Sequence, residues 1–518
     1  MKNWAWHGVM ALAVAGSLAL APRGHAESVI RTVPQLDVKF LDPYQNSNYG
    51  TRNHGHMIYE TLFAWDAKQQ PKPDMVGDYS VSSDKMTYRF TLRPGLKWHD
   101  GKPVTTADVI ASLDKWMKKD ALGQKLAGAM GSLKADDDKT FTLTLKQPFG
   151  LVLDALAKPS NYPPFILPER FAKLADGAPE FEPIGSGPFI FQKDQWQPGN
   201  RNVYLRNPDY VPRNEPPDGF AGGKVVKVDR VEWLTMPDVN TAANALIAGE
   251  VDRIENVSYD VVAQLENNPD ITVQPTDAQG TQHYLRPNQA HPPFDNLKAR
   301  QALLYAIDHD EYGRAVTGDK RFYVDCWAYV MCGSTYGSDA GAIKPDLAKA
   351  KTLLQEAGYK GEPIQMPEPT NTPQFDAGAL ITASQLKKAG FNIELMPMDY
   401  NIMISRRAKK DGWNLYVSGN QAVDVASPMT NVYLASNCEE AAPGWPCDKM
   451  LEDLKDAFAR AETDEERKAI AEKIQLRAIE TVPYVPVGQL RTLTAHRNSL
   501  KGVLVSPIAL YWNVEKRG

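Results

Sequence analysis

The 518-residue sequence has no excess of one charge and few cysteines, and beyond its first residues it has no long apolar run. Lys and Arg number 58 against 63 Asp and Glu, which gives a formal charge of −5. This balance provides no electrostatic reason to expect a nucleic-acid partner. No later stretch approaches the ~18 consecutive apolar residues of a membrane-spanning helix. The composition is that of a globular chain, and its length predicts roughly three domains.

Motifs of several enzyme classes are also missing. The sequence contains no G-x-x-x-x-G-K-[ST] loop, no G-x-S-x-G elbow and no H-E-x-x-H, so the usual signatures of nucleotide, serine-hydrolase and zinc-protease chemistry are absent. His54, His56 and Glu60 come nearest to a metal-ligand cluster, but residues two apart point to different faces of a helix. We therefore expect no catalytic residues, no bound metal and no cofactor.

The N-terminus has the pattern of a secretory signal peptide. Lys2 precedes an apolar run from Val9 to Ala21, and small residues at Gly24 and Ala26 mark a cut after Ala26. The run is too short to span a membrane as a helix. Residues 1–26 are thus predicted to be removed, and the mature chain is expected in the periplasm of a diderm bacterium.

The four cysteines form two local pairs, Cys326 with Cys332 and Cys438 with Cys447. In an oxidising compartment this spacing suggests two short disulfide-closed loops, although four cysteines allow three pairings. Neither pair has the C-x2-4-C spacing of a zinc site.

Regular elements of both kinds are predicted. Alternating apolar residues from Met86 to Leu92 indicate a half-buried strand. Helices are expected to begin at Thr105 to Asp108 and, with a capping box, at Thr463 to Glu466. The proline-rich stretches Pro159 to Pro168 and Asn207 to Asp218 predict surface connections or lobe boundaries without regular structure. The pattern is that of a large α/β protein.

Several separated sequence segments are spread along most of the mature chain. Together they resemble the family 5 extracellular solute-binding proteins of peptide and related ABC importers. These segments are Tyr59 to Phe63, Met86 to Val109, Ile184 to Phe189, Asn207 to Tyr210, Leu246 to Asp252, Pro293 to Asp308, Ala348 to Tyr359 and Asp448 to Asp453.

The resemblance implies a two-lobed α/β periplasmic-binding-protein fold of type II, from the large cluster with an extra domain inserted in the first lobe. The first lobe would comprise residues 27–59, 185–283 and 487–518. The extra domain would comprise residues 60–184, and the second lobe residues 284–486. Two hinge strands are expected near 280–288 and 482–490.

The function implied by the resemblance is capture of a peptide or peptide-like solute between two closing lobes. The closed protein would deliver it to ABC permease subunits served by a separate cytoplasmic ATPase, and we expect a monomer that is not an enzyme. Alternatives remain open at this point: a non-peptide solute such as an opine, oligosaccharide or metal chelate, a sensory role, or a secreted hydrolase on the same scaffold.

The resemblance also suggests site residues. Asp424 matches the acidic residue that receives a peptide's α-amino group, although it also fits a cap of the following turn. Many peptide binders have Gly-Trp where this chain has Gly419-Asn420, which exchanges apolar area for hydrogen-bond capacity and suits a more polar ligand. Tyr49 is predicted to be an aromatic contact from the first lobe, or part of an ordinary surface loop.

Overall fold

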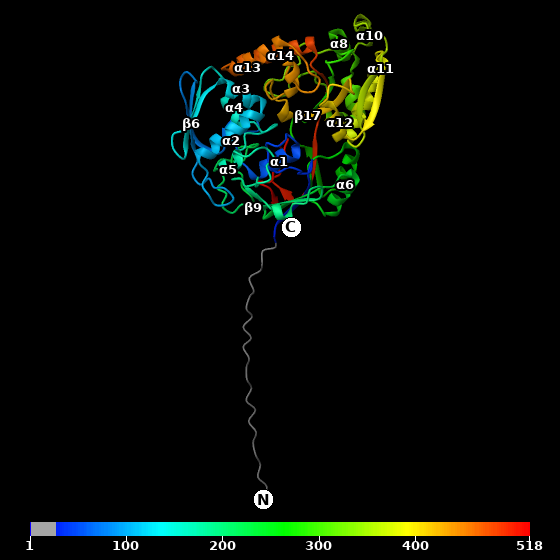
Figure 1. The fold of residues 1–518 in the computed structure, drawn as a ribbon. Coiled ribbons are helices and arrows are strands. Elements are labelled where there is room, and N and C mark those ends of the chain that lie inside the picture. Colours follow the sequence, from blue (N-terminus) through cyan, green and yellow to red (C-terminus); the bar gives the residue numbers. More distant parts are fainter. Residues whose placement is uncertain (2–26, 518) are drawn as a thin grey trace.

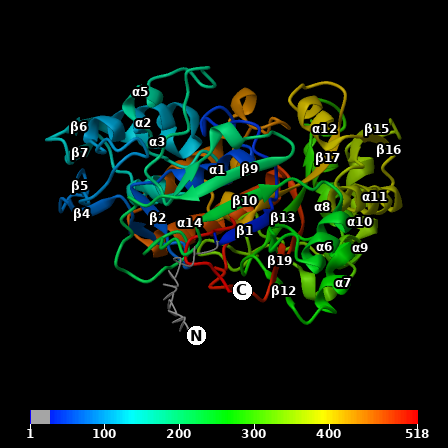
Figure 2. The same cartoon turned by 90° about the horizontal axis from the view of Figure 1, so that it is seen from below.

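The computed structural model describes residues 27–517 together with Met1, so the predicted signal peptide lies outside the described residues. Both views show a molecule with three regions. Strand β6 and helices α2 and α3 lie at one end, helices α10 and α11 lie at the other, and strands β9 and β10 lie between them (Figures 1 and 2). None of the helices within residues 27–517 combines the length and apolarity of a membrane crossing.

The central region contains a seven-stranded sheet built from distant parts of the chain. Strand β1 runs parallel to β10 and β11, whereas β19, near the C-terminus, pairs antiparallel with both β11 and β12. The strands in spatial order are β12 (Ile271–Pro275), β19 (Leu493–Arg497), β11 (Arg253–Ile254), β1 (Val29–Val33), β10 (Arg230–Leu234), β9 (Arg201–Arg206) and β8 (Phe189–Phe191). Helices α6 (Val239–Ala248) and α7 (Val262–Glu266) share an apolar cluster with this sheet.

A second sheet has the order β14 (Tyr323–Val324), β18 (Val485–Leu490), β13 (Thr281–Pro287) and β17 (Leu415–Gln421). The chain crosses from one sheet to the other twice, from β12 to β13 at residues 276–280 and from β18 to β19 at residues 491–492. These passages lie side by side, because the Thr276 amide donates to the Thr492 carbonyl over 2.9 Å and the Thr281 and Thr492 hydroxyls are 2.7 Å apart. The strands expected near 280–288 and 482–490 are thus present as the antiparallel pair β13 and β18.

The outer part of this second region is α/β. Strands β15 and β16 are parallel to each other, and their crossover helix α11 packs on β15 and on α9. The elements are α8 (Leu297–Ala306), α9 (His309–Thr317), α10 (Leu347–Glu356), β15 (Ile364–Pro369), α11 (Pro373–Lys388), β16 (Ile393–Met398), α12 (Tyr400–Arg407), α13 (Lys449–Arg460) and α14 (Asp464–Thr481).

The third region is a four-stranded antiparallel sheet with flanking helices. Phe90 and Phe141 face each other across paired strands, with ring centroids 5.1 Å apart, and anchor its core. The elements are β4 (Val76–Val81), β5 (Thr87–Leu92), β7 (Thr140–Leu145), β6 (Met130–Ala135), α2 (Thr106–Lys119), α3 (Ala121–Ala129), α4 (Val152–Ala157), α5 (Glu169–Ala172) and the hairpin of β2 (Phe63–Trp65) with β3 (Pro71–Pro73).

Several local predictions are confirmed, and the surface location expected for one proline-rich stretch is wrong. Strand β5 covers the alternating segment, and capping boxes open α2 at Thr105 and α14 at Thr463. The stretch Pro159 to Pro168 is irregular as predicted, but most of it is buried rather than on the surface. Its apolar residues, including Phe165, enter the core, and the Ile166 amide donates to the Glu60 carbonyl, so the backbone is satisfied away from water.

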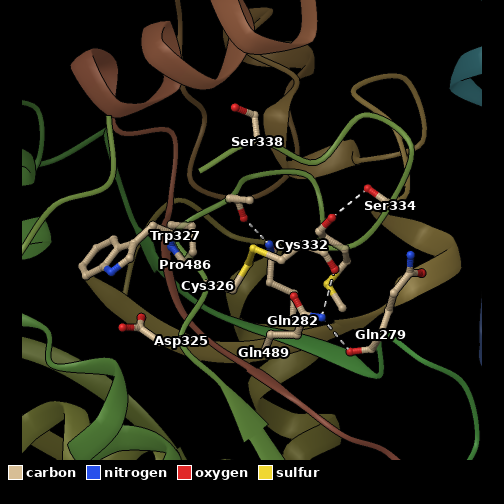
Figure 3. Close-up of a disulfide and its surroundings, with 12 residues drawn as sticks. Gln279, Gln282, Asp325, Cys326, Trp327, Cys332, Ser334, Ser338, Pro486 and Gln489 are labelled. Atoms are coloured by element: carbon tan, nitrogen blue, oxygen red, sulfur yellow. Dashed lines mark hydrogen bonds between the residues drawn. A yellow bond between two sulfur atoms is a disulfide. The ribbon is translucent and has the colours of Figure 1, made fainter. Parts of the chain in front are cut away.

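Both predicted disulfides are present, Cys326 with Cys332 and Cys438 with Cys447. Figure 3 shows the first beside the strands that lead to the central sheet. The Gln489 side chain, from β18, donates to the Cys332 carbonyl over 3.2 Å and to the Gln279 carbonyl over 2.9 Å. The Cys326 loop is therefore tied to the passage between the two sheets.

Candidate functional site

A cavity of about 190 Å³ lies where the central region meets the second region. One wall carries Gln35, Leu36, Tyr49, Asn256, Val257 and Tyr259, from segments around the central sheet, and the other carries residues of β13, β17, α11 and α12. The remaining lining residues are Thr281, His283, Thr372, Gln374, Phe375, Tyr400, Gly419, Gln421, Leu490 and Thr492.

A second cavity, of about 220 Å³, continues this space. The two cavities share Asn256, Val257, Tyr259, Thr372 and Gln374 as lining residues. Together they fall in the lower part of the ~300–1,000 Å³ range of small-molecule sites. The arrangement is a continuous cleft between two separately built regions.

The floor of the cleft is formed where β17 pairs with β13. Gly419 lies opposite His283, and a Cβ atom on Gly419 would approach the His283 ring to 2.9 Å and the Phe375 ring to 3.2 Å. Glycine therefore lets these rings reach the strand. Phe375 stacks on Tyr400 with centroids 5.4 Å apart, which provides a flat apolar surface. Burial lowers the pKa of His283 to about 3, so this side chain is neutral at physiological pH.

An ion pair crosses the inner end of the cleft. Helix α1 (Tyr49–Ile58) begins beside the cavity and presents Tyr49 and Arg52. The Tyr49 hydroxyl donates to Asp424 Oδ2 over 2.6 Å, and Arg52 Nη1 lies 3.4 Å from Asp424 Oδ1. Asp424 ends the short 3-10 helix η4 (Ala422–Asp424) directly after β17. The Arg52 and Asp424 side chains are only 2% and 3% exposed.

The other contacts of Arg52 hold it firmly in place. Its Nη2 donates to Gln421 Oε1, and its Nε and Nη2 both donate to Asn53 Oδ1 over 3.2 Å. The guanidinium also lies over the Tyr49 ring at 4.2 Å, a cation–π contact. Burial and the neighbouring Asp424 carboxylate raise the pKa of Tyr49, which keeps its hydroxyl protonated as a donor.

The structure brings three of the four predicted ligand residues to this cleft. Tyr49 and Gly419 line the cavity, and Asp424 contacts Tyr49 and Arg52 behind it. Asn420 points elsewhere: it does not line either cavity, and its Nδ2 is buried without a hydrogen-bond partner among the described residues.

Sequence reasoning missed Arg52 and Gln421. Arg52 follows Tyr49 by three residues in one helix, and such residues share a helix face. That spacing would have identified Arg52 once Tyr49 was chosen.

The residues considered as a metal cluster have separate surroundings. His54 Nδ1 lies 2.9 Å from the Tyr204 hydroxyl, and His56 Nε2 lies 3.2 Å from the Pro159 carbonyl. The Glu60 carboxylate instead pairs with Arg93. Within residues 27–517 no group of three or more His, Cys, Asp or Glu side chains is arranged to hold a metal ion.

Comparison with known proteins defines the class. Residues 70–442 match the family described as bacterial extracellular solute-binding proteins, family 5 Middle. A Sinorhizobium fredii relative, described as a probable peptide ABC transporter periplasmic-binding protein, is 36% identical over 98% of this chain and 97% of its own length. The chain therefore belongs to the family 5 solute-binding proteins, and it is the solute-binding protein of an ABC importer.

More distant relatives differ in ligand. The glutathione-binding protein GsiB of Escherichia coli is 25% identical over 96% of both chains. The Agrobacterium tumefaciens protein AgaA, solved with agropinic acid, is 24% identical with a TM-score of 0.80 over 95% of this chain and 99% of its own. AgaA confirms the two-lobed fold. Members of this family are binding proteins that work with permease subunits rather than enzymes.

Proposed function

We propose that the protein captures a peptide or peptide-like solute in the cleft and holds it through an ammonium group on Asp424. The observation that carries this proposal is the position of Asp424 at the inner end of the cleft, buried and within 2.6 Å of Tyr49 from the opposite wall. A buried ammonium needs an anionic partner, because an unpaired charge away from water costs several kcal/mol. The peptide description of the 36%-identical relative supports the same ligand class.

Closure is expected to be a hinge movement at β13 and β18. In this proposal, residues 27–59, 185–283 and 487–518 form the first lobe, 60–184 an inserted domain and 284–486 the second lobe. The adjacent passages at 276–280 and 491–492 support this division, since two short neighbouring connections allow rotation of one lobe against the other. A ligand that contacts both walls binds the closed form more tightly and shifts the population towards it.

The remaining features of the proposal follow from the sequence. The chain acts in the periplasm after cleavage behind Ala26, as a monomer that carries out no chemical step itself. Energy for transport comes from a separate cytoplasmic ATPase of the importer.

The test is native mass spectrometry of protein released gently from the periplasm, followed by identification of the bound molecules. We expect amine-bearing peptides or peptide-like compounds, and small-angle scattering should show compaction when they are added back to the stripped protein. A single sugar, or a metal complex without a free amine, would overturn the peptide assignment. Turnover of the bound molecule by the purified protein would overturn the transport role.

A further inference from the structure

We propose that the ligand presents an ammonium and a carboxylate on the same carbon atom, with Asp424 binding the ammonium and Arg52 the carboxylate. The ligand class is thus a compound with a free amino-acid head, such as a γ-glutamyl peptide. The proposal rests on the proposed function and narrows it.

The ion pair between Arg52 and Asp424 has a loose geometry. The contact between Arg52 Nη1 and Asp424 Oδ1 is 3.4 Å, longer than the ~2.7–2.9 Å of a close charge-assisted hydrogen bond. Nη1 makes no other hydrogen bond in the described structure, whereas Nε and Nη2 are held by Asn53 and Gln421. The edge of the guanidinium that faces Asp424 is therefore the edge with spare donor capacity.

The two residues of the pair come from opposite walls of the cleft. Arg52 belongs to α1 and Asp424 follows β17, so opening the cleft separates them. Both are bonded to residues that line the cavity, Arg52 to Gln421 and Asp424 to Tyr49. The two charges thus lie directly behind Tyr49 and Gln421 at the inner end of the cleft, and opening of the cleft gives a ligand access to both.

The charges of this buried pair must stay balanced when a ligand binds. A ligand with an ammonium alone would give Asp424 two cationic neighbours and leave Arg52 without a full counter-charge in a buried site. A ligand with a carboxylate alone would do the converse to Asp424. Unpaired buried charges are strongly unfavourable, whereas an amino-acid head replaces each partner of the pair with an equivalent charge.

The rest of the cleft points to the same head group. Among the described residues that line the two cavities, Asp260 alone carries a formal charge at neutral pH, and it is anionic. The C-terminal carboxylate of an ordinary extended peptide would meet no lining lysine or arginine. The Arg52 guanidinium is hydrogen-bonded to the lining residue Gln421 and stacks on Tyr49, so a cation lies beside the ammonium site. The Phe375 and Tyr400 stack then offers apolar contact to the part of the ligand beyond the head.

The experiment uses pairs of isomers. γ-Glutamyl and α-glutamyl dipeptides with the same second residue have the same atoms and net charge, but only the γ isomers have the ammonium and a carboxylate on one carbon. Calorimetric titration of the ligand-stripped mature protein with a panel of such pairs should show the γ isomers binding at least about tenfold more tightly.

Variants identify the residue responsible. Arg52→Gln should lower the affinity for the γ isomers by more than about tenfold and remove the preference for them over the α isomers. If Arg52→Gln folds poorly, Arg52→Lys replaces it, and this variant should keep part of the preference because lysine retains the positive charge. Arg314→Gln, at an exposed arginine of α9 paired with Asp310, is the matched control and should leave both affinities unchanged.

Outcomes separate this proposal from the broader one. Failure of the γ isomers to bind, equal binding of both isomers, or a preference that survives in Arg52→Gln would each overturn the amino-acid head. If ordinary peptides are nevertheless recovered from the periplasmic protein and bind through Asp424, the proposed function stands without it. Recovery of a ligand without an amine would overturn both.

Discussion

Two buried ion pairs, one formed by a residue within helix α1 and one by a residue just beyond its end, differ in their surroundings. Arg52, in its first turn, meets Asp424 across the cleft at 3.4 Å, whereas Glu60, two residues beyond its end, meets Arg93 at 2.8 Å. All three guanidinium nitrogens of Arg93 have partners within 3.1 Å, the Asp74 and Val211 carbonyls and the Glu60 carboxylate.

Glu60 is equally well satisfied. Its carboxylate also accepts from the Ser186 hydroxyl over 2.8 Å and from the Tyr210 hydroxyl over 3.2 Å. A closed network of this kind fixes the fold, and a pair with one loose edge facing a cleft leaves room for a ligand. Similar burial of two ion pairs therefore does not imply a similar role.

The largest expected effect is at the closed network. Glu60→Gln keeps the side-chain shape but leaves Arg93 buried without its counter-charge, so we expect the free energy of unfolding to fall by about 3–5 kcal/mol. Urea denaturation monitored by circular dichroism measures this. A loss below ~1 kcal/mol would mean that the network contributes little to stability.

The matched change in the cleft is Asp424→Asn. Because opening of the cleft lets Arg52 reach water, we expect a smaller loss of stability than in Glu60→Gln, while an amine-bearing ligand binds about 2–5 kcal/mol more weakly. Denaturation and calorimetric titration of the two variants in parallel give both quantities. Unchanged affinity in Asp424→Asn would remove this residue from the site.

Low pH should destabilise the folded protein through its buried histidines. Burial lowers the pKa of His54 to about 3, and the ordinary value is 6.5. The unfolded chain therefore binds a proton at a pH where the folded chain does not, and the free energy of unfolding should fall as the pH drops from 6.5 towards 3. His54→Gln should flatten this pH dependence. An equally steep profile in the variant would assign the effect to other groups.

The smallest effect is expected at an exposed pair. Lys449 and Asp453 on α13 are 86% and 59% exposed, and exposed pairs one helical turn apart are worth only about 0.3–0.5 kcal/mol. Lys449→Gln should therefore leave the midpoint of thermal unfolding almost unchanged, and added salt should reduce the small difference from the wild type further, because salt screens exposed charges. A large loss would show that exposure is a poor guide to the role of an ion pair here.

Local sequence signals predicted much of the fold. Strand β5, the capping boxes of α2 and α14 and both disulfides could be read from residues close together in the chain. The burial of Pro159 to Pro168 could not, because proline content reports the lack of regular structure and not which segments cover it. The same limit applies to the candidate site. Tyr49 and Asp424 could each be predicted from the sequence, but their contact depends on how α1 and β17 are placed across the cleft.

The place of β19 has a consequence for the order of folding. This strand, at Leu493–Arg497, lies between β12 and β11 in the seven-stranded sheet. While the chain is being synthesised from its N-terminus, the edge strand β12 has no neighbour in the sheet until β19, which follows the second region in sequence, has been made. Domains generally fold as units during synthesis, yet this sheet can be completed only after the second region has been made. Completion of the central sheet therefore depends on synthesis of the second region.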